Sequence, residues 1–181
     1  MTEYMLIDNE KYRLKILLNE KDFDYYTDIW IELLCGNNHI ILFKDNLLAL
    51  KNIVKEYDKE VCNLDHTLEE KNLGLLLNEY YRCSYEEQLQ EGIVLDEHGQ
   101  WIGERYCCFT YLNCATWIYR YAENIIIKVT PIFCGFEEDD YTKKYSDFVV
   151  NYKDIFKEIT SLQELITMKE NILKLYDKLF L

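Results

Sequence analysis

Alternating apolar and polar positions in the first quarter of the chain predict β-strands. Short strands are expected at residues 4–7 and 12–18. A longer strand, residues 26–35, is followed by Gly36-Asn37-Asn38 and by a partner strand at residues 39–44. Gly and Asn tolerate the positive φ angles that a tight hairpin needs. The segment therefore predicts antiparallel pairing.

Helical spacing of apolar residues begins after this hairpin. Asp45 is the expected N-cap, and the apolar positions that follow recur at intervals of three and four: Leu47, Leu50, Ile53, Val54, Tyr57 and Val61. A second amphipathic helix is expected near the C-terminus. There, Thr160 and Ser161 precede Gln163 and Glu164 by three residues each, which gives two overlapping capping boxes.

The middle of the chain allows two interpretations. Residues 67–70 and 73–82 are either two extended pieces, or residues 75–89 form one helix. Strands are favoured because Gly74 and the paired Tyr80-Tyr81 suit a sheet better. The polar stretch 86–100 that follows contains a turn-like Glu97-His98-Gly99.

Further strands are expected in the last third of the molecule. Residues 105–112 and 115–121 predict an aromatic-rich hairpin around Asn113. Residues 125–133 are strongly β-branched, and Pro131 indicates an edge or a strand end. An acidic loop, residues 134–144, then leads to a predicted strand at residues 147–152.

Two extended segments followed by a helix therefore occur twice, in residues 28–62 and 124–181. The copies share the order of their elements but no residues. We expect an α+β fold, with a mostly antiparallel β-sheet, two amphipathic helices packed on one face, and a loose strand-strand-helix pseudo-repeat. The length fits a single domain, residues 1–181, with halves at 1–66 and 67–181 as the alternative.

The net charge of −13 disfavours direct binding to nucleic acid, because phosphate contacts need Lys and Arg. An acidic surface serves solubility, or it meets a basic partner. No stretch of about 20 apolar residues predicts a membrane span, and the N-terminus does not resemble a signal peptide. Seven cysteines favour a reducing compartment, so a cytoplasmic location is expected.

Motifs for catalysis, cofactors or metals are missing from the sequence. The cysteines form no C-x-x-C pair and the histidines have no ligand spacing, so no metal site is expected. Cys107-Cys108 is interpreted as a buried apolar pair. Asp65-His66 is interpreted as a local hydrogen-bonding pair, since no nucleophile accompanies it. We expect no cofactor, no catalytic residue and no enzymatic activity.

Two features are candidates for binding a partner. The densest acidic run, Glu137, Glu138, Asp139 and Asp140, lies between two predicted strands. Its alternative interpretation is a solvated loop. Trp101 follows a polar stretch and is the candidate exposed anchor, whereas Trp30 and Trp117 lie in predicted strands and are expected in the core.

Three short stretches resemble segments of one family: Asp28-Ile29-Trp30-Ile31-Glu32, Lys44-Asp45-Asn46-Leu47-Leu48, and Leu68-Glu69-Glu70-Lys71-Asn72-Leu73-Gly74-Leu75. The family is that of bacterial wall-associated-protein (WapI-type) immunity proteins and their uncharacterised relatives. Its third segment typically reads E-P-N-L, and Lys71 here replaces that Pro. The resemblance implies a protein that binds and blocks a toxin domain made by the same cell, and it carries no catalytic residues over.

Charge and resemblance together predict an immunity-type protein that occludes a cognate toxin domain, such as a nuclease, sterically and electrostatically. Two alternatives are open. One is an inhibitor of a basic nucleic-acid enzyme that is encoded by a phage or mobile element. The other is a small enzyme without a recognisable motif, using Asp65 and His66. The oligomeric state is left open, and an oligomerisation module would pair exposed strand edges between copies.

Overall fold

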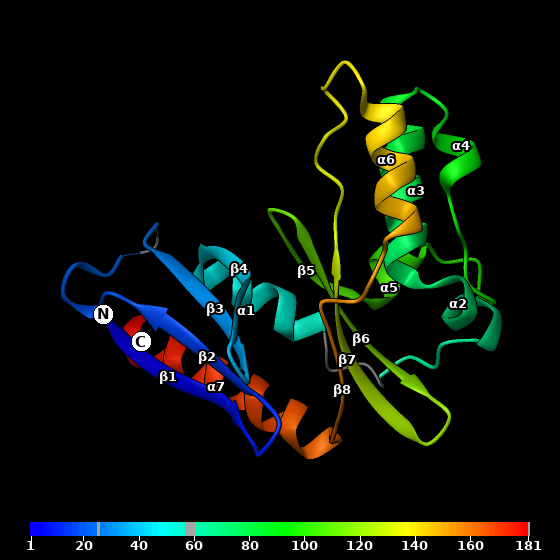
Figure 1. Ribbon diagram of the computed structural model, residues 1–181. Coiled ribbons are helices and arrows are strands. Elements are labelled where there is room, and N and C mark those ends of the chain that lie inside the picture. The colour runs from blue at the N-terminus through cyan, green and yellow to red at the C-terminus, as the bar shows by residue number, and fades with distance from the viewer. Residues whose placement is uncertain (25, 57–60, 181) are drawn as a thin grey trace. The chain divides into compact units, whose positions relative to one another are not determined.

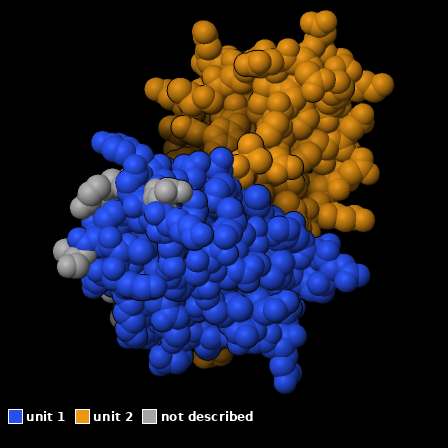
Figure 2. Space-filling model, turned by 90° about the vertical axis from the view of Figure 1, so that its left-hand side faces the viewer, with its two compact units in different colours: residues 1–61, 158–181 blue, residues 62–157 orange. Residues whose placement is uncertain are grey.

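The computed structural model describes residues 1–24, 26–56 and 61–180 (Figure 1). The chain divides into two compact units, which Figure 2 distinguishes by colour. Unit 1 contains residues Met1–Val61 and Glu158–Leu181, and unit 2 contains Cys62–Lys157. Unit 2 is therefore inserted, along the sequence, between the two pieces of unit 1. Among the described helices, none has both the length and the apolar character that a membrane crossing requires.

Unit 1 contains a four-stranded sheet in the order β1-β2-β3-β4. Its strands are β1 (Thr2–Asp8), β2 (Arg13–Leu18), β3 (Asp28–Cys35) and β4 (Asn38–Asn46), and each pairs with its neighbour antiparallel. A 3-10 turn, η1 (Glu20–Asp22), follows β2. Gly36 has a φ of 56° in the β3–β4 turn. The strands and the turn predicted for this part of the sequence are confirmed.

Among the described residues of unit 1, the chain forms the α-helices α1 (Leu47–Glu56) and α7 (Leu162–Phe180). They contact each other, and α7 also contacts β1. Both begin close to the predicted positions, because their buried side chains recur at helical spacing: Leu47, Leu50 and Val54 in α1, and Met168, Ile172, Leu175 and Tyr176 in α7. The predicted continuation of the first helix through Tyr57 lies outside the described residues.

The predicted N-cap of α1 is wrong by one residue. Strand β4 runs through Asp45 and ends at Asn46. The side-chain oxygen of Asn46 accepts a hydrogen bond from the backbone N–H of Ala49 at 2.9 Å. Asp45 instead accepts from the backbone N–H of Asn46. Asn46 therefore satisfies a free N–H group of the first turn, as an N-cap does.

The second sheet has the order β5-β6-β7-β8. Its strands are β5 (Cys107–Tyr111), β6 (Cys114–Tyr121), β7 (Asn124–Pro131) and β8 (Phe156–Thr160), and β6 pairs antiparallel with both β5 and β7. The boundary between the units falls within β8. The predicted aromatic hairpin is confirmed, and Pro131 is the last residue of β7, as its missing N–H favours.

The strands predicted in the middle of the chain are wrong. Residues 66–71 form α2 (His66–Lys71), and residues 73–85 form α3 (Leu73–Tyr85). Leu73 and Leu77 are buried one helical turn apart in the core of unit 2. Gly74 had suggested a sheet, but its role is packing: a Cβ there would lie 2.5 Å from the Cβ of Thr130. The helix thus approaches its neighbours closely, which only glycine permits.

Two short helices follow α3, α4 (Leu89–Gly92) and α5 (Ile102–Tyr106). The predicted turn between them is confirmed, since Gly99 has a φ of 73°. The strand predicted at residues 147–152 is wrong, because the chain forms α6 (Tyr141–Val150) there. Tyr141, Tyr145 and Phe148 are the partly buried positions of α6, at intervals of four and three.

The α+β class with antiparallel strand pairing is confirmed. The strands form two sheets rather than one, and the packing of two helices on one face of a single sheet is not confirmed. The pseudo-repeat is wrong, since the second copy reads β7, α6, β8, α7 instead of strand, strand, helix. Its last helix also belongs to unit 1, whereas β7 belongs to unit 2.

Candidate partner-binding surface

The acidic segment, Glu137-Glu138-Asp139-Asp140, lies in the connection between β7 and α6 of unit 2. All four residues are exposed, and Asp140 occupies the N-cap position of α6 without a side-chain capping bond. The ammonium of Lys144 contacts Glu138 and lies 3.0 Å from Asp140 Oδ1. Within the described ranges, neither Glu137 nor Asp139 has a cationic partner. The segment thus presents carboxylates to solvent at the start of α6.

Helix α6 packs through one aromatic side. None of its residues is buried, and Val150 is 80% exposed. The ring of Tyr145 lies 5.4 Å from that of Phe133 and 5.8 Å from that of Phe136, measured between centroids. Aromatic pairs at such distances stabilise a contact beyond their buried area. Rings from the connection and from α6 therefore fix the helix that follows the acidic segment.

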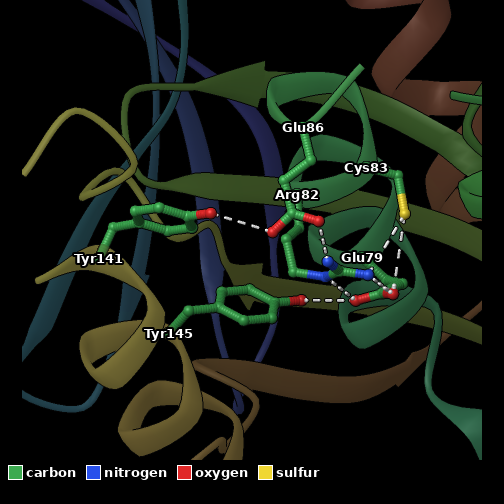
Figure 3. A network of polar contacts seen from close by, with 6 residues as sticks. All are labelled: Glu79, Arg82, Cys83, Glu86, Tyr141 and Tyr145. Atoms are coloured by element: carbon green, nitrogen blue, oxygen red, sulfur yellow. Dashed lines mark hydrogen bonds and ion pairs between the residues drawn. The ribbon is translucent and has the colours of Figure 1, made fainter. Parts of the chain in front are cut away.

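A polar network joins α6 to α3 (Figure 3). Arg82 donates to Glu79 through Nε at 2.9 Å and Nη2 at 2.5 Å, and it also contacts Glu86 through Nη1. From α6, the hydroxyl of Tyr145 donates to Glu79 at 3.2 Å and that of Tyr141 donates to Glu86 at 3.1 Å. Each phenol thus binds a carboxylate that Arg82 already neutralises.

Three members of this network, Glu79, Arg82 and Tyr145, have pKa values that their contacts shift. Hydrogen bonds from Arg82 hold the pKa of Glu79 below its usual value, although burial opposes this. The same bonds raise the pKa of Arg82 further. Burial, and then the charge of Glu79, raises the pKa of Tyr145. Both shifts in pKa favour the charged form of Glu79 and the protonated, donating form of Tyr145.

Trp101 is less exposed than expected, and its role as a binding anchor stays a prediction. Its side chain is only partly exposed and packs against the core of unit 2. Its ring lies 4.7 Å from that of Tyr80, and a Cβ on Gly103 would come within 2.5 Å of it. Of the other tryptophans, Trp117 is fully buried as predicted. Trp30 is only partly buried, with the Lys44 ammonium 5.4 Å from its ring.

The remaining candidates have local roles. Asp65 caps α2 by accepting from the N–H of Leu68 at 3.0 Å, and His66 lies 3.5 Å from Glu70. Asp65 and His66 therefore form no acid–base pair with each other. Cys108 is buried and Cys107 is partly buried, where burial raises the pKa of the Cys107 thiol to about 12. Across the part of the chain that the structure describes, no group of three or more His, Cys, Asp or Glu side chains is placed to hold a metal ion.

The network around Arg82 was not predicted from the sequence. Glu79, Arg82 and Glu86 follow at spacings of three and four, which is the spacing of ion pairs on a helix. The same spacing relates Tyr141 to Tyr145. Both signals are present in the sequence, but they carry meaning only if the segments are helical. Residues 73–82 were interpreted as a strand, and residues 134–144 were interpreted as a loop.

No family model, no curated protein and no solved structure was found to match this chain.

Proposed function

We propose that this protein binds a basic protein partner through the acidic segment and the adjoining end of α6, and blocks it. The observation that carries the proposal is that Glu137 and Asp139 are exposed to solvent on a protein whose net charge is −13. Complementary charge accelerates association and disfavours wrong partners. Carboxylates also form charge-assisted hydrogen bonds with Lys and Arg.

The fixed position of α6 supports this role. Because Arg82, Tyr141 and Tyr145 hold the helix on α3, less conformational entropy is lost when a partner binds at its N-terminal end. The carboxylates are then presented in one arrangement. A surface of this kind fits a partner whose own cations bind phosphates, since the carboxylates substitute for phosphate oxygens.

The partner that we propose is a toxin domain, with a nuclease as the first choice. This rests on the acidic charge and on the resemblance to WapI-type immunity proteins. The protein then acts without catalysis, in the cytoplasm, by covering the active-site surface of the toxin. The carboxylates accept hydrogen bonds from cations that otherwise contact the nucleic acid.

The test mixes the purified protein with the product of the adjacent upstream gene. We expect a complex at micromolar concentration and rescue of cells from that product. The variant E137Q/E138Q/D139N/D140N is expected to slow association by about tenfold or more at low salt. The absence of both complex and rescue would overturn the proposal.

A matched control separates local contacts from total charge. The variant D8N/E10Q/E123Q/D177N removes four negative charges from exposed positions that have no cationic partner among the described residues. Both variants change the net charge equally, so a general field effect lowers both association rates alike. We expect the control to bind nearly as well as the unmodified protein.

A further inference from the structure

Large apolar side chains are exposed where α3 ends and α4 begins. Tyr85 is 49% exposed, Leu89 43% and Ile93 45%; these three residues are the α3–α4 patch. Helix α4 packs back onto α3, because a Cβ on Gly92 would lie 2.8 Å from the Cβ of Cys83. The patch is thus built on packed elements, and grouped apolar exposure of this kind marks interaction sites.

The charge around the patch has one sign. No Lys or Arg occurs between Arg82 and Arg105, whereas this stretch contains six Asp and Glu residues. Glu87 and Glu91 are exposed and alternate in sequence with the apolar residues of the patch. Neither is paired with a cation within the described chain. The segment that carries the patch therefore contains negative but no positive side chains between Arg82 and Arg105.

The patch is continuous with the acidic segment. The ring of Tyr85 lies 5.5 Å from that of Phe136 and 5.2 Å from that of Tyr141, measured between centroids. Phe136 directly precedes the acidic segment and Tyr141 directly follows it. Both α4 and α6 lie beside α3 (Figure 1). Through Tyr85, the patch therefore contacts residues on both sides of the acidic segment, about fifty residues away in sequence.

We propose that the α3–α4 patch receives apolar side chains of the basic partner, so that the bound segment is amphipathic, with Leu or aromatic residues flanked by Lys and Arg. This inference rests on the proposed function and adds the second half of the binding surface. Apolar anchors supply affinity at protein interfaces, and the surrounding charges supply association rate and specificity. A second copy of this chain fits poorly, because it would place like charges opposite one another.

The test uses two synthetic peptides with equal length and equal numbers of lysines, in which the other positions are all leucine or all serine. Binding to the full chain is followed by fluorescence anisotropy at low salt. We expect the leucine peptide to bind about tenfold more tightly than the serine peptide. The variant L89S/I93S is expected to remove this difference. A circular-dichroism melt checks that the variant is folded.

The control variant is I166S, which replaces an apolar residue of similar exposure on α7 (42%). It should leave the preference for leucine unchanged. Equal affinity for the two peptides, or equal losses in L89S/I93S and I166S, would overturn the inference while leaving the acidic-segment proposal standing. Failure of both peptides to bind, or binding that neutralisation of the acidic segment leaves unchanged, would instead contradict the proposed function itself.

Discussion

Ser161 and Glu164 cap the first turn of α7 reciprocally. The backbone N–H of Ser161 donates to Glu164 Oε2 at 2.8 Å, and the backbone N–H of Glu164 donates to Ser161 Oγ at 3.1 Å. Glu164 also accepts a hydrogen bond from the side chain of Asn9 at 2.7 Å. The cap therefore joins the start of α7 to the β1–β2 connection, and it realises one of the two capping boxes predicted from the sequence.

Replacing Glu164 by Ala removes the carboxylate from the reciprocal cap and from Asn9. We expect the free energy of unfolding to fall by about 1 to 2 kcal/mol, as for other lost N-terminal caps. Urea denaturation followed by circular dichroism measures this change. The control is Gln163→Ala, at an exposed neighbouring position, which should stay within about 0.5 kcal/mol of the unmodified protein. Equal effects of the two substitutions would contradict the capping role.

Arg82 neutralises the carboxylates of Glu79 and Glu86 on the α3 side of the network. These are the two carboxylates to which the tyrosine hydroxyls of α6 donate, so Arg82 supports the contact between α3 and α6. Replacing it by Gln is expected to loosen α6 by about 1 kcal/mol, a modest value because the ion pairs are partly exposed. Hydrogen exchange of the α6 amides should become faster while the β6 and β7 amides stay protected. Lys174→Gln, which breaks an exposed pair with Glu170 on α7, should leave α6 unchanged. Unaltered exchange in α6 of the Arg82 variant would count against the network.

Gly74 leaves no room for a side chain. An added Cβ would lie 1.9 Å from the hydroxyl of Tyr152 and 2.5 Å from the Cβ of Thr130. We expect Gly74→Ala to lower stability by about 2 kcal/mol or more, in spite of the better helix propensity of Ala. The double variant G74A/Y152F should recover part of the loss, and Ser84→Ala, at an exposed site of α3, should be nearly neutral. If Gly74→Ala were more stable than the unmodified protein, the space between Gly74 and its neighbours Tyr152 and Thr130 would be larger than the structure shows.

Asp96 makes the stability of unit 2 sensitive to acid. Burial alone would raise its pKa, but hydrogen bonds from the backbone N–H groups of Gln100 and His98, and the charge of Arg105, hold the pKa below its usual value. Arg105 Nε lies 2.8 Å from Asp96 Oδ2, as an ion pair without aligned hydrogen-bond geometry. Because the folded-state pKa of Asp96 is lowered, its charged carboxylate stabilises the folded protein, and this stabilisation is complete above the unfolded-state pKa. It is lost as the pH falls through the folded-state value.

Denaturation curves between about pH 7 and about pH 3 measure this dependence. The unmodified protein should lose stability below about pH 4. Asp96→Asn should be less stable at neutral pH by about 2 kcal/mol, because Arg105 loses its partner. It should also lose less on acidification. Asp8→Asn, at an exposed position, serves as the control. An acid response of the Asp96 variant as steep as that of the unmodified protein would rule out this role.

The sequence predicted unit 1 well because its signals are local. Strand alternation, the Gly36 turn and the capping residues of α7 each act within a few positions. Apart from the N-cap of α1 and the burial of Trp30, the failures lie in unit 2, where the structural role of a residue depends on its neighbours in space. Gly74 suggested a strand, although its purpose is contact with Thr130. Residues 147–152 suggested a strand, but α6 packs the rings of Tyr145 and Phe148 against Phe133, a contact that the local pattern does not contain.

The candidate site was predicted only in part. The exposure of the acidic segment follows from its charge, because unpaired carboxylates are costly to bury. The packing of Trp101 does not follow from the sequence. The polar stretch before it gives no indication that its ring packs against Tyr80 and Gly103. The adjacency of Tyr85 and Phe136 is likewise a result of the fold of unit 2, and no local pattern contains it.

The insertion of unit 2 within unit 1 affects the order in which the protein folds during synthesis. Unit 2 is one continuous stretch, so it is complete once Lys157 has left the ribosome. At that point unit 1 still lacks α7, and the apolar side chains that pack with this helix remain uncovered. Domains fold as units in the order in which they emerge. Nascent unit 2 should therefore become resistant to protease first. The N-terminal part of unit 1 should become resistant only after α7 has been synthesised.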